Sequence, residues 1–148
     1  MNIIKKYEGV DGLYKVTMNS TKANGELLIY EISYSSLNKF LDEDRRERAR
    51  RAFLKNKVKV REITNQTYKE SYTSVEGYDE QVMNVRYVDE GILKIDAEMI
   101  IYNDVVVYYS LQNPINAIEI HDERLAKMQR QIFEFVWKSG KKLSDKRS

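Results

Sequence analysis

The sequence contains no cysteine, one histidine and one proline among its 148 residues. The absence of cysteine excludes disulfides, thiolate catalysis and sulfur-ligated metals, and a single histidine excludes a histidine-rich zinc site. No apolar run approaches the roughly 20 residues that a membrane-spanning helix needs. Residues 1–6 also lack the apolar core of a signal peptide. We expect a cytoplasmic protein with no membrane association, and we predict no resident metal or cofactor.

The composition that remains is that of a folded domain. Hydrophobic residues make up 42% of the chain and charged residues 32%, which favours a soluble globular protein over a disordered one. A length of 148 residues suits one domain with a substantial core. The net charge of +2 does not by itself indicate nucleic-acid binding. The 11 tyrosines favour strand-rich, half-buried surfaces.

Hydrophobic periodicity and turn signals predict that strands and helices alternate in the first half of the chain. In chain order we expect a strand at 2–7, a helix at 9–18, a strand at 26–33, a helix at 37–55 and a strand at 58–64. Residues 65–80 are polar and rich in turn formers. Four strands then follow, at 82–88, 93–102, 105–110 and 115–120, and a final helix begins after Asp122 and ends near Gly140.

This order of elements predicts the fold class. Alternating strands and helices favour right-handed crossovers and parallel strand pairs, whereas the two-residue turn Asn103-Asp104 indicates an antiparallel hairpin. We expect one α/β domain, residues 1–142, with a mixed but mostly parallel sheet flanked by helices. Residues 143–148 are expected to form a frayed basic tail.

The two long predicted helices differ in character. In the final helix, an apolar stripe at three- and four-residue spacing predicts docking against the sheet or a second subunit. The stripe consists of Leu125, Met128, Ile132, Phe135 and Val136, and Phe133 and Trp137 widen it. In the helix at 37–55, acids precede bases by four residues at three places, which predicts a solvated outer helix. The alternative is that this helix presents a basic face to a phosphate backbone.

The segment at 96–103 has the spacing of a phosphodiesterase motif. Asp96, Glu98 and Asn103 stand where the pattern H-x-K-x4-D has its histidine, lysine and aspartate, and a second predicted strand leads to Ser110. The arrangement resembles the active-site strand of phospholipase-D-like enzymes, which need the histidine as nucleophile and the lysine to hold the phosphate. Two carboxylates in these places would repel a phosphate. The resemblance implies a catalytic scaffold without catalysis, so we do not expect an enzyme.

Further short motifs resemble the C-terminal effector domain of TrmB-type transcriptional regulators, in its phospholipase-D-like form. They lie at residues 7–12, 58–61, 101–106, 117–119 and 129–137, in the order that the family shows. The resemblance implies a role in transcription regulation, as a non-catalytic ligand-sensing domain that forms a homodimer. It also implies a small polar ligand, such as a sugar or a sugar phosphate. The winged helix-turn-helix of the family has no counterpart in this sequence, so we do not expect direct DNA binding.

Polar residues near the predicted strand ends are the candidate ligand-binding residues, because open α/β sheets place ligands there. They are Tyr7, Glu8, Ser33, Asp96, Glu98 and Ser110. Asp96 and Glu98 alternate onto one face of their predicted strand, where they could bind a divalent ion with water or hydrogen-bond to sugar hydroxyls. The alternative is that both lie on the solvent face of an edge hairpin, with Ile95, Ala97 and Met99 facing the core.

His121 is interpreted as a structural residue that precedes the helix cap Asp122. Two other functions remain open beside the effector domain. One is a divergent phospholipase-D-like phosphodiesterase or nuclease. The other is a nucleic-acid or protein interaction module that uses residues 45–51 and the basic tail.

Overall fold

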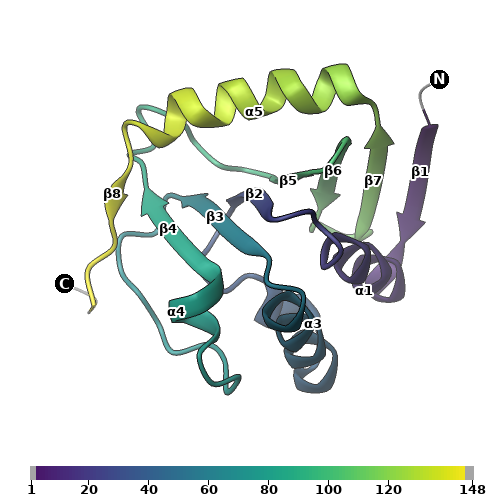
Figure 1. Ribbon diagram of the computed structural model, residues 1–148, viewed down its shortest axis with the longest axis horizontal. Coiled ribbons are helices and arrows are strands. Elements are labelled where there is room, and N and C mark those ends of the chain that lie inside the picture. Colours follow the sequence, from purple (N-terminus) through teal and green to yellow (C-terminus); the bar gives the residue numbers. More distant parts are fainter. Residues whose placement is uncertain (1–2, 146–148) are drawn as a thin grey trace.

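Eight strands form one mixed sheet within residues 3–145, the part of the chain that the computed structural model describes (Figure 1). The strands are β1 (Ile3–Glu8), β2 (Glu26–Glu31), β3 (Lys59–Thr64), β4 (Met83–Tyr87), β5 (Glu98–Tyr102), β6 (Val105–Ser110), β7 (Asn116–His121) and β8 (Lys141–Lys142). Their order across the sheet is β1-β7-β6-β5-β2-β3-β4-β8. β1 therefore lies at one edge, and β2 and β5 lie side by side in the middle.

Helices cover both faces of this sheet (Figure 1). On one face lie α1 (Gly9–Ser20), α2 (Leu37–Phe40), α3 (Glu43–Lys55) and α4 (Tyr78–Val82), and on the other lies α5 (Glu123–Trp137). Along β2, Leu27 and Ile29 pack in the core on the α1 side, whereas Leu28 and Tyr30 pack on the α5 side. This alternation explains why the sequence of β2 is an unbroken apolar run. The α/β domain with a mixed sheet between helices is as predicted.

The predicted balance of strand directions is wrong. Within the described residues, only the pairs β2–β3 and β3–β4 are parallel, and the other five pairings are antiparallel. Short turns join β5 to β6 and β6 to β7, and a short turn can only connect antiparallel neighbours. The helix α1 does cross from β1 to β2, but these two strands are not neighbours because β5, β6 and β7 lie between them.

The predicted helix at 37–55 is also wrong, because the chain breaks it at residues 41–42. Leu41 is extended and buried, and Asp42 caps α3 by accepting a hydrogen bond from the backbone N–H of Arg45 at 2.8 Å. Aspartate is favoured as an N-cap and disfavoured inside a helix, so Asp42 starts a new helix. The helix α3 is not simply solvated either, since Glu47 and Arg50 are buried.

Other boundaries follow the sequence more closely. The strand predicted at 93–102 begins only at Glu98, and Asn103 occupies the expected two-residue turn with a left-handed φ of 48°. Asp122 caps α5 as predicted. Lys141 and Lys142 pair with β4, and Leu143 beyond them is buried, while residues 146–148 of the predicted tail lie outside the described residues. Nowhere in residues 3–145 is there a helix long and apolar enough to cross a membrane.

The sheet-facing side of α5 differs from the predicted stripe. Ala126, Phe133 and Trp137 are its buried residues, whereas Met128, Ile132 and Phe135 are exposed. The helix therefore has a second apolar stripe, which faces away from the sheet.

Candidate functional site

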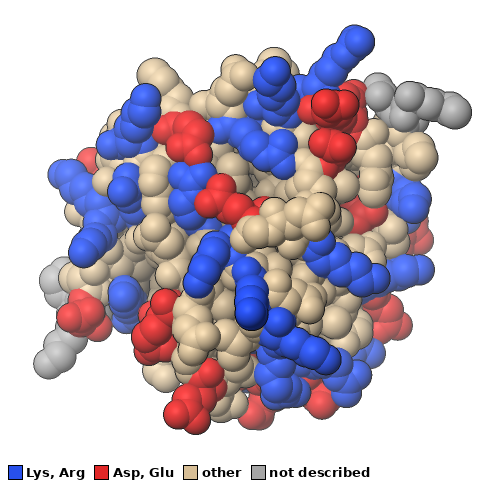
Figure 2. Space-filling model, viewed as in Figure 1, with Lys and Arg blue, Asp and Glu red and all other residues tan. Residues whose placement is uncertain are grey.

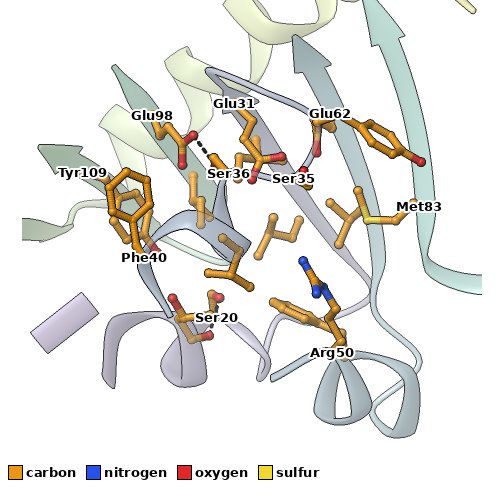
Figure 3. A pocket seen from close by; sticks show the side chains of 18 of the residues that line it. Ser20, Glu31, Ser35, Ser36, Phe40, Arg50, Glu62, Met83, Glu98 and Tyr109 are labelled. Atoms are coloured by element: carbon orange, nitrogen blue, oxygen red, sulfur yellow. Dashed lines mark hydrogen bonds between the residues drawn. The ribbon is translucent and has the colours of Figure 1, made fainter. Parts of the chain in front are cut away.

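A cavity of about 90 Å³ lies between the sheet and the helices α1, α2 and α3 (Figure 3). Much of its wall is apolar. The sheet contributes Leu27, Ile29, Val60 and Ile100, and the helices contribute Leu13, Leu37, Phe40 and Phe53. An apolar wall of this kind, with a few polar groups converging on it, is typical of a small-molecule site.

Three glutamates reach into the cavity from the sheet (Figure 3). Glu31 ends β2, Glu62 lies in β3 and Glu98 begins β5, with exposed fractions of 8%, 1% and 6%. The strand register brings the three glutamates together. Glu62 of β3 lies opposite Ile29 of β2, two residues before Glu31. The last pair between β2 and β5 is Tyr30 with Met99, so the next residues, Glu31 and Glu98, lie side by side. All three side chains therefore leave the sheet on the α1 side.

The hydroxyl of Ser36 joins two of these carboxyl groups. Its Oγ lies 2.9 Å from Glu31 Oε1 and 2.5 Å from Glu98 Oε2. A serine hydroxyl has one proton to donate, so the second of these hydrogen bonds needs a proton on a carboxyl group. The backbone N–H of Ile32 also donates to Glu98 Oε2, at 3.1 Å. Glu31 and Glu62 in turn hydrogen-bond to each other, which again requires one of them to be protonated.

Burial raises the pKa of all three carboxyl groups, and repulsion from neighbouring carboxyl groups adds to the rise for Glu62 and Glu98. Burial is the largest cause for each of them. Burial and the nearby charge of Glu31 raise the pKa of Glu98 from 4.5 to about 8. Burial, then Glu31 and more weakly Glu98, raise the pKa of Glu62 well above its usual range. The cluster therefore retains protons at neutral pH, which is a common property of functional sites.

Arg50 faces the carboxyl groups from α3 on the opposite side of the cavity (Figure 3). Its Nη1 donates to Glu47 Oε2 at 3.3 Å and to the carbonyl oxygen of Tyr72 at 3.0 Å, and its guanidinium lies over the Tyr72 ring. Glu47 is itself buried and pairs with this guanidinium, which also opposes the rise in the pKa of Glu31 without cancelling it. Arg50 therefore neutralises at most part of the cluster.

Two polar atoms on the cavity wall are buried with fewer hydrogen bonds than they can make. Apart from the bond between the Glu31 and Glu62 carboxyl groups, Glu62 Oε2 accepts none, and the Tyr109 hydroxyl has only a contact of poor geometry with Thr17. Their side chains are 1% and 3% exposed. Buried polar atoms are almost always hydrogen-bonded, because leaving one unpaired costs about 1–3 kcal/mol. These two atoms mark the place where a polar group of a ligand would be bound.

The structure separates the two carboxylates that the sequence places together. Glu98 lines the cavity, but Asp96 precedes β5, is exposed and lines a neighbouring hollow of about 280 Å³ together with Ser110. The hollow and the cavity share Phe40, Tyr109 and Leu111. A strand face shared by the two carboxylates is wrong, because Asp96 lies outside β5. The alternative is wrong in placing Glu98 on the solvent face of an edge hairpin, since β5 lies between β2 and β6 and Glu98 is buried. Ile95 and Met99 do pack in the core, as that alternative expected.

The remaining candidates do not line the cavity. The Tyr7 hydroxyl donates to the buried Glu119 at 3.2 Å, and Glu119 Oε1 also lies 3.1 Å from Nε2 of His121. Glu8 is exposed at the end of β1, 3.8 Å from Lys6. Ser33 is half-buried and its Oγ has no hydrogen-bond partner. A ligand-binding role for Tyr7, Glu8 and Ser33 stays a prediction.

The sequence analysis missed Glu31 and Glu62. Each lies in a buried strand, two residues after an apolar residue that points to the same face of the sheet. These apolar residues are Ile29 in β2 and Val60 in β3. An acid on the apolar side of a buried strand is the signal that could have found them. Among the described residues, no three histidine, aspartate or glutamate side chains are arranged to hold a metal ion.

Comparisons with known proteins agree with the fold. No protein-family model matches the chain, and no curated protein matches it in sequence. Several solved structures resemble it, among them TrmBL2, NucT and Nuc. TrmBL2, an archaeal chromatin protein whose structure shows a novel mode of DNA binding, has a TM-score of 0.62 at 18% identity. NucT from Helicobacter pylori has a TM-score of 0.65 at 13% identity. Nuc from Salmonella typhimurium, a phospholipase D family member, has a TM-score of 0.64 at 15% identity.

The coverage differs among these structures. The match covers 95% of this chain and 98% of NucT, and 100% of both this chain and Nuc. It covers 95% of this chain but only 55% of TrmBL2, so the chain spans about half the length of that protein. The chain therefore has the phospholipase-D-like fold that the sequence motifs predict, shared with TrmBL2 and with the two Nuc proteins.

Proposed function

We propose that this chain is a non-catalytic ligand-sensing domain, and that it binds a small polar molecule in the cavity of Glu31, Glu62 and Glu98. The observation on which this rests is the convergence of buried polar groups with unused hydrogen-bonding capacity, Glu62 Oε2 and the Tyr109 hydroxyl, on a partly apolar cavity wall. A bound ligand would favour the conformation that satisfies these atoms and shift the population towards it. This is the physical basis of a sensor.

The residues at the positions of the phospholipase-D motif support binding rather than catalysis. Asp96 and Glu98 stand where the enzymes have histidine and lysine, and only Glu98 lines the cavity, whereas Asp96 is exposed before β5. His121, the only histidine of the sequence, contacts Glu119 on β7. A cluster of buried carboxyl groups also disfavours a phosphodiester. The competing function is a divergent nuclease, in keeping with the fold shared with Nuc.

Transcription regulation and dimerisation belong to the same proposal. We expect a homodimer that forms through the exposed apolar stripe of α5, and a role in regulating transcription through this dimer. Direct DNA binding is not part of the proposal. Figure 2 shows Lys and Arg interspersed with Asp and Glu on the viewed face, and along α3 Asp44 pairs with Arg48 at 2.9 Å. Mixed charges of this kind bind a phosphate backbone weakly.

A thermal-shift screen tests the sensing function. Amines, sugars, sugar phosphates, nucleotides and divalent ions are compared on the wild type, on Leu111→Trp and on the control Ile92→Trp. Leu111 lines the cavity and is half-buried, so a tryptophan there obstructs it, whereas Ile92 is exposed and does not line it. A ligand at 100 times its dissociation constant adds about 2.7 kcal/mol, which moves the midpoint by several degrees.

We expect a selective shift in the wild type and in Ile92→Trp that is lost in Leu111→Trp. A shift that survives in Leu111→Trp would place the ligand elsewhere. Cleavage of a phosphodiester by the pure protein, abolished in Asp96→Asn or Glu98→Gln, would replace the sensor by the nuclease.

A further inference from the structure

If all three carboxyl groups of the cavity were ionised, they would carry more negative charge than the single facing guanidinium could neutralise. The three carboxyl groups converge on the cavity, and the one guanidinium that faces them is bound to the buried Glu47. Without a ligand the cluster is stable only because protons remain on the carboxyl groups. An occupant that supplies positive charge could take the place of these protons.

We propose that the ligand of this cavity is an alkylammonium ion, whose charged nitrogen lies among Glu31, Glu62 and Glu98 and whose alkyl chain lies against the apolar wall. The inference rests on the proposed function, since it assigns a ligand class to the same cavity. It follows from the charge of the cluster, the unused hydrogen-bonding capacity of its buried atoms and the apolar lining together.

The hydrogen-bonding groups match an ammonium group. An –NH₃⁺ group has three donors and no acceptor. Once Glu62 has lost its proton, its Oε2 is a free acceptor, the Tyr109 hydroxyl can accept as well, and Glu31 and Glu98 supply further carboxylate oxygens. A phosphate or carboxylate ligand would instead add repulsion to the cluster.

The lining separates an alkylammonium from a sugar. A sugar presents hydroxyls around its whole ring, and each hydroxyl facing an apolar wall would be buried without a partner. Here the apolar residues Leu27, Ile29, Val60 and Ile100 form one part of the lining. An alkyl chain loses nothing against such a wall and is stabilised by leaving water.

The volume limits the ligand to a few heavy atoms. A cavity of about 150 Å³ holds benzene, and this cavity of about 90 Å³ is smaller. An ammonium group with a short alkyl chain is of suitable size. A longer ligand would extend past Phe40 and Leu111, which the cavity shares with the neighbouring hollow.

Binding of a cation should release protons from the cluster. The charged and titratable groups around the carboxyl groups come from every element that packs there. They are Lys39 of α2, Arg50 of α3, Tyr78 and Asp79 of α4, Tyr109 of β6, and Tyr34 and Tyr72 of the loops. The tyrosine hydroxyls stay protonated, because burial raises the pKa of each above its ordinary value of 10.0. The protons that leave therefore come from the glutamates.

Calorimetric titration of the full chain with n-butylammonium chloride tests the proposal, with 1-butanol as the uncharged probe of matched shape. Each titration is repeated in two buffers of different ionisation enthalpy, which counts the protons released. We expect butylammonium to bind with proton release, and to bind up to about tenfold more tightly per pH unit from about pH 6 to about pH 8. Butanol should bind at least tenfold more weakly.

Variants locate the site. Glu62→Gln and Glu98→Gln keep the side-chain shape but remove the charge, so each should weaken butylammonium binding at least tenfold. Glu43→Gln, on the exposed first turn of α3, is the control and should bind as the wild type does. The comparison of butylammonium with butanol and the proton count need no variant, so the test stands even if a variant does not fold.

Three results would contradict the proposal in distinguishable ways. If butanol or a sugar binds as well as butylammonium and Leu111→Trp abolishes it, the ligand class is wrong and the sensing function stands. If butylammonium binds equally to Glu62→Gln, Glu98→Gln and Glu43→Gln, its site lies elsewhere. If no compound of any class binds in the cavity, the proposed function is wrong as well.

Discussion

The buried carboxyl groups Glu31, Glu62 and Glu98 link the stability of the fold to pH. Folding raises the pKa of Glu98 from 4.5 to about 8, chiefly through burial, and raises that of Glu62 further in the same direction. Between its unfolded and folded pKa, such a group binds more protons in the folded state. Its stabilising contribution is complete below the unfolded pKa and is lost as the pH rises through the folded pKa.

The first prediction is therefore a loss of stability from about pH 5 to about pH 8. The free energy of unfolding, measured by urea denaturation, should fall by a few kcal/mol over this interval in the wild type. In Glu62→Gln and Glu98→Gln the fall should be smaller, because glutamine does not ionise. Glu47 and Glu134 do not contribute to this fall in stability. Their pKa values are lowered in the folded protein, so they change protonation only below this pH interval.

Glu43→Gln is the control for this prediction, because Glu43 is exposed. The free energy of unfolding of this variant should fall with pH as steeply as that of the wild type. Equal wild-type stability at the two pH values, or variants that fall as steeply as the control, would show that the cluster is ionised in the folded protein.

Sequence reasoning found only one of the three clustered glutamates. The spacing of Asp96 and Glu98 places both on one face only if both lie in a strand, and β5 begins at Glu98. Glu31 and Glu62 come together through the pairing of β2 with β3, and Glu98 joins them through the pairing of β2 with β5. These contacts between distant residues depend on the strand order, which the local hydrophobic pattern does not show.

At the scale of elements, α5 is attached to the sheet by a small aromatic cluster. Phe133 is 0% exposed and packs edge-on against Tyr30, with ring centroids 5.2 Å apart, and stacks on Trp137 at 5.8 Å. The guanidinium of Arg61 lies over the rings of both Phe133 and Trp137 and also pairs with Glu134 of the same helix. Aromatic stacking, a cation–π contact and an ion pair thus act on one helix.

The second prediction compares two phenylalanines that are two residues apart on this helix. Phe133→Ala should lower the free energy of unfolding by about 3–5 kcal/mol, because it leaves a cavity in the core. Phe135→Ala should change it by less than about 0.5 kcal/mol, since Phe135 is 78% exposed. Urea denaturation is measured on dilute, monomeric protein. Similar losses in both variants would mean that α5 docks through a different face.

The elements themselves were readable from the sequence wherever one strong local signal was present. Asp122 and the turn Asn103-Asp104 mark their boundaries correctly, through a helix cap and a hairpin turn. The break at Leu41–Asp42 was missed because the charged run that follows is compatible with one long helix. Leu41 is buried in the core in an extended conformation, and this places Asp42 where it can cap α3.

At the scale of the whole molecule, the strand order was not predicted, because it depends on contacts between residues that are distant in the sequence. The hairpin of β5 and β6 and the strand β7 enter the middle of the sheet beside β2, so β1 is displaced to the edge next to β7. A sheet with β1 beside β2 would have the same local hydrophobic pattern along each strand as the observed sheet. Local patterns therefore do not distinguish the two strand orders. The sequence motifs predicted the phospholipase-D-like fold correctly because their order along the chain reflects this topology.

The outer side of α5 gives the molecule a surface suited to a second copy of itself. Met128, Ile132 and Phe135 follow one another at spacings of four and three residues, and all are exposed. Beside them lies a hollow of about 390 Å³, lined by Leu93, Met99, Tyr108, Ile132 and Val136 among others. A protruding phenylalanine and an apolar hollow close to each other are what an isologous two-fold contact requires, because each copy can insert into the other.

The third prediction is that the chain is a dimer in solution and that Phe135→Glu separates it. Light scattering after size exclusion should give twice the chain mass of 17.5 kDa for the wild type. Burial of a glutamate in an apolar contact is unfavourable, so the variant should elute as a monomer with an unchanged circular dichroism spectrum. Lys127→Glu, also exposed on α5 but outside the apolar stripe, is the control for added negative charge and should remain dimeric. A monomeric wild type at high concentration would exclude this interface, and a dimeric Phe135→Glu would place the contact on another face of the molecule.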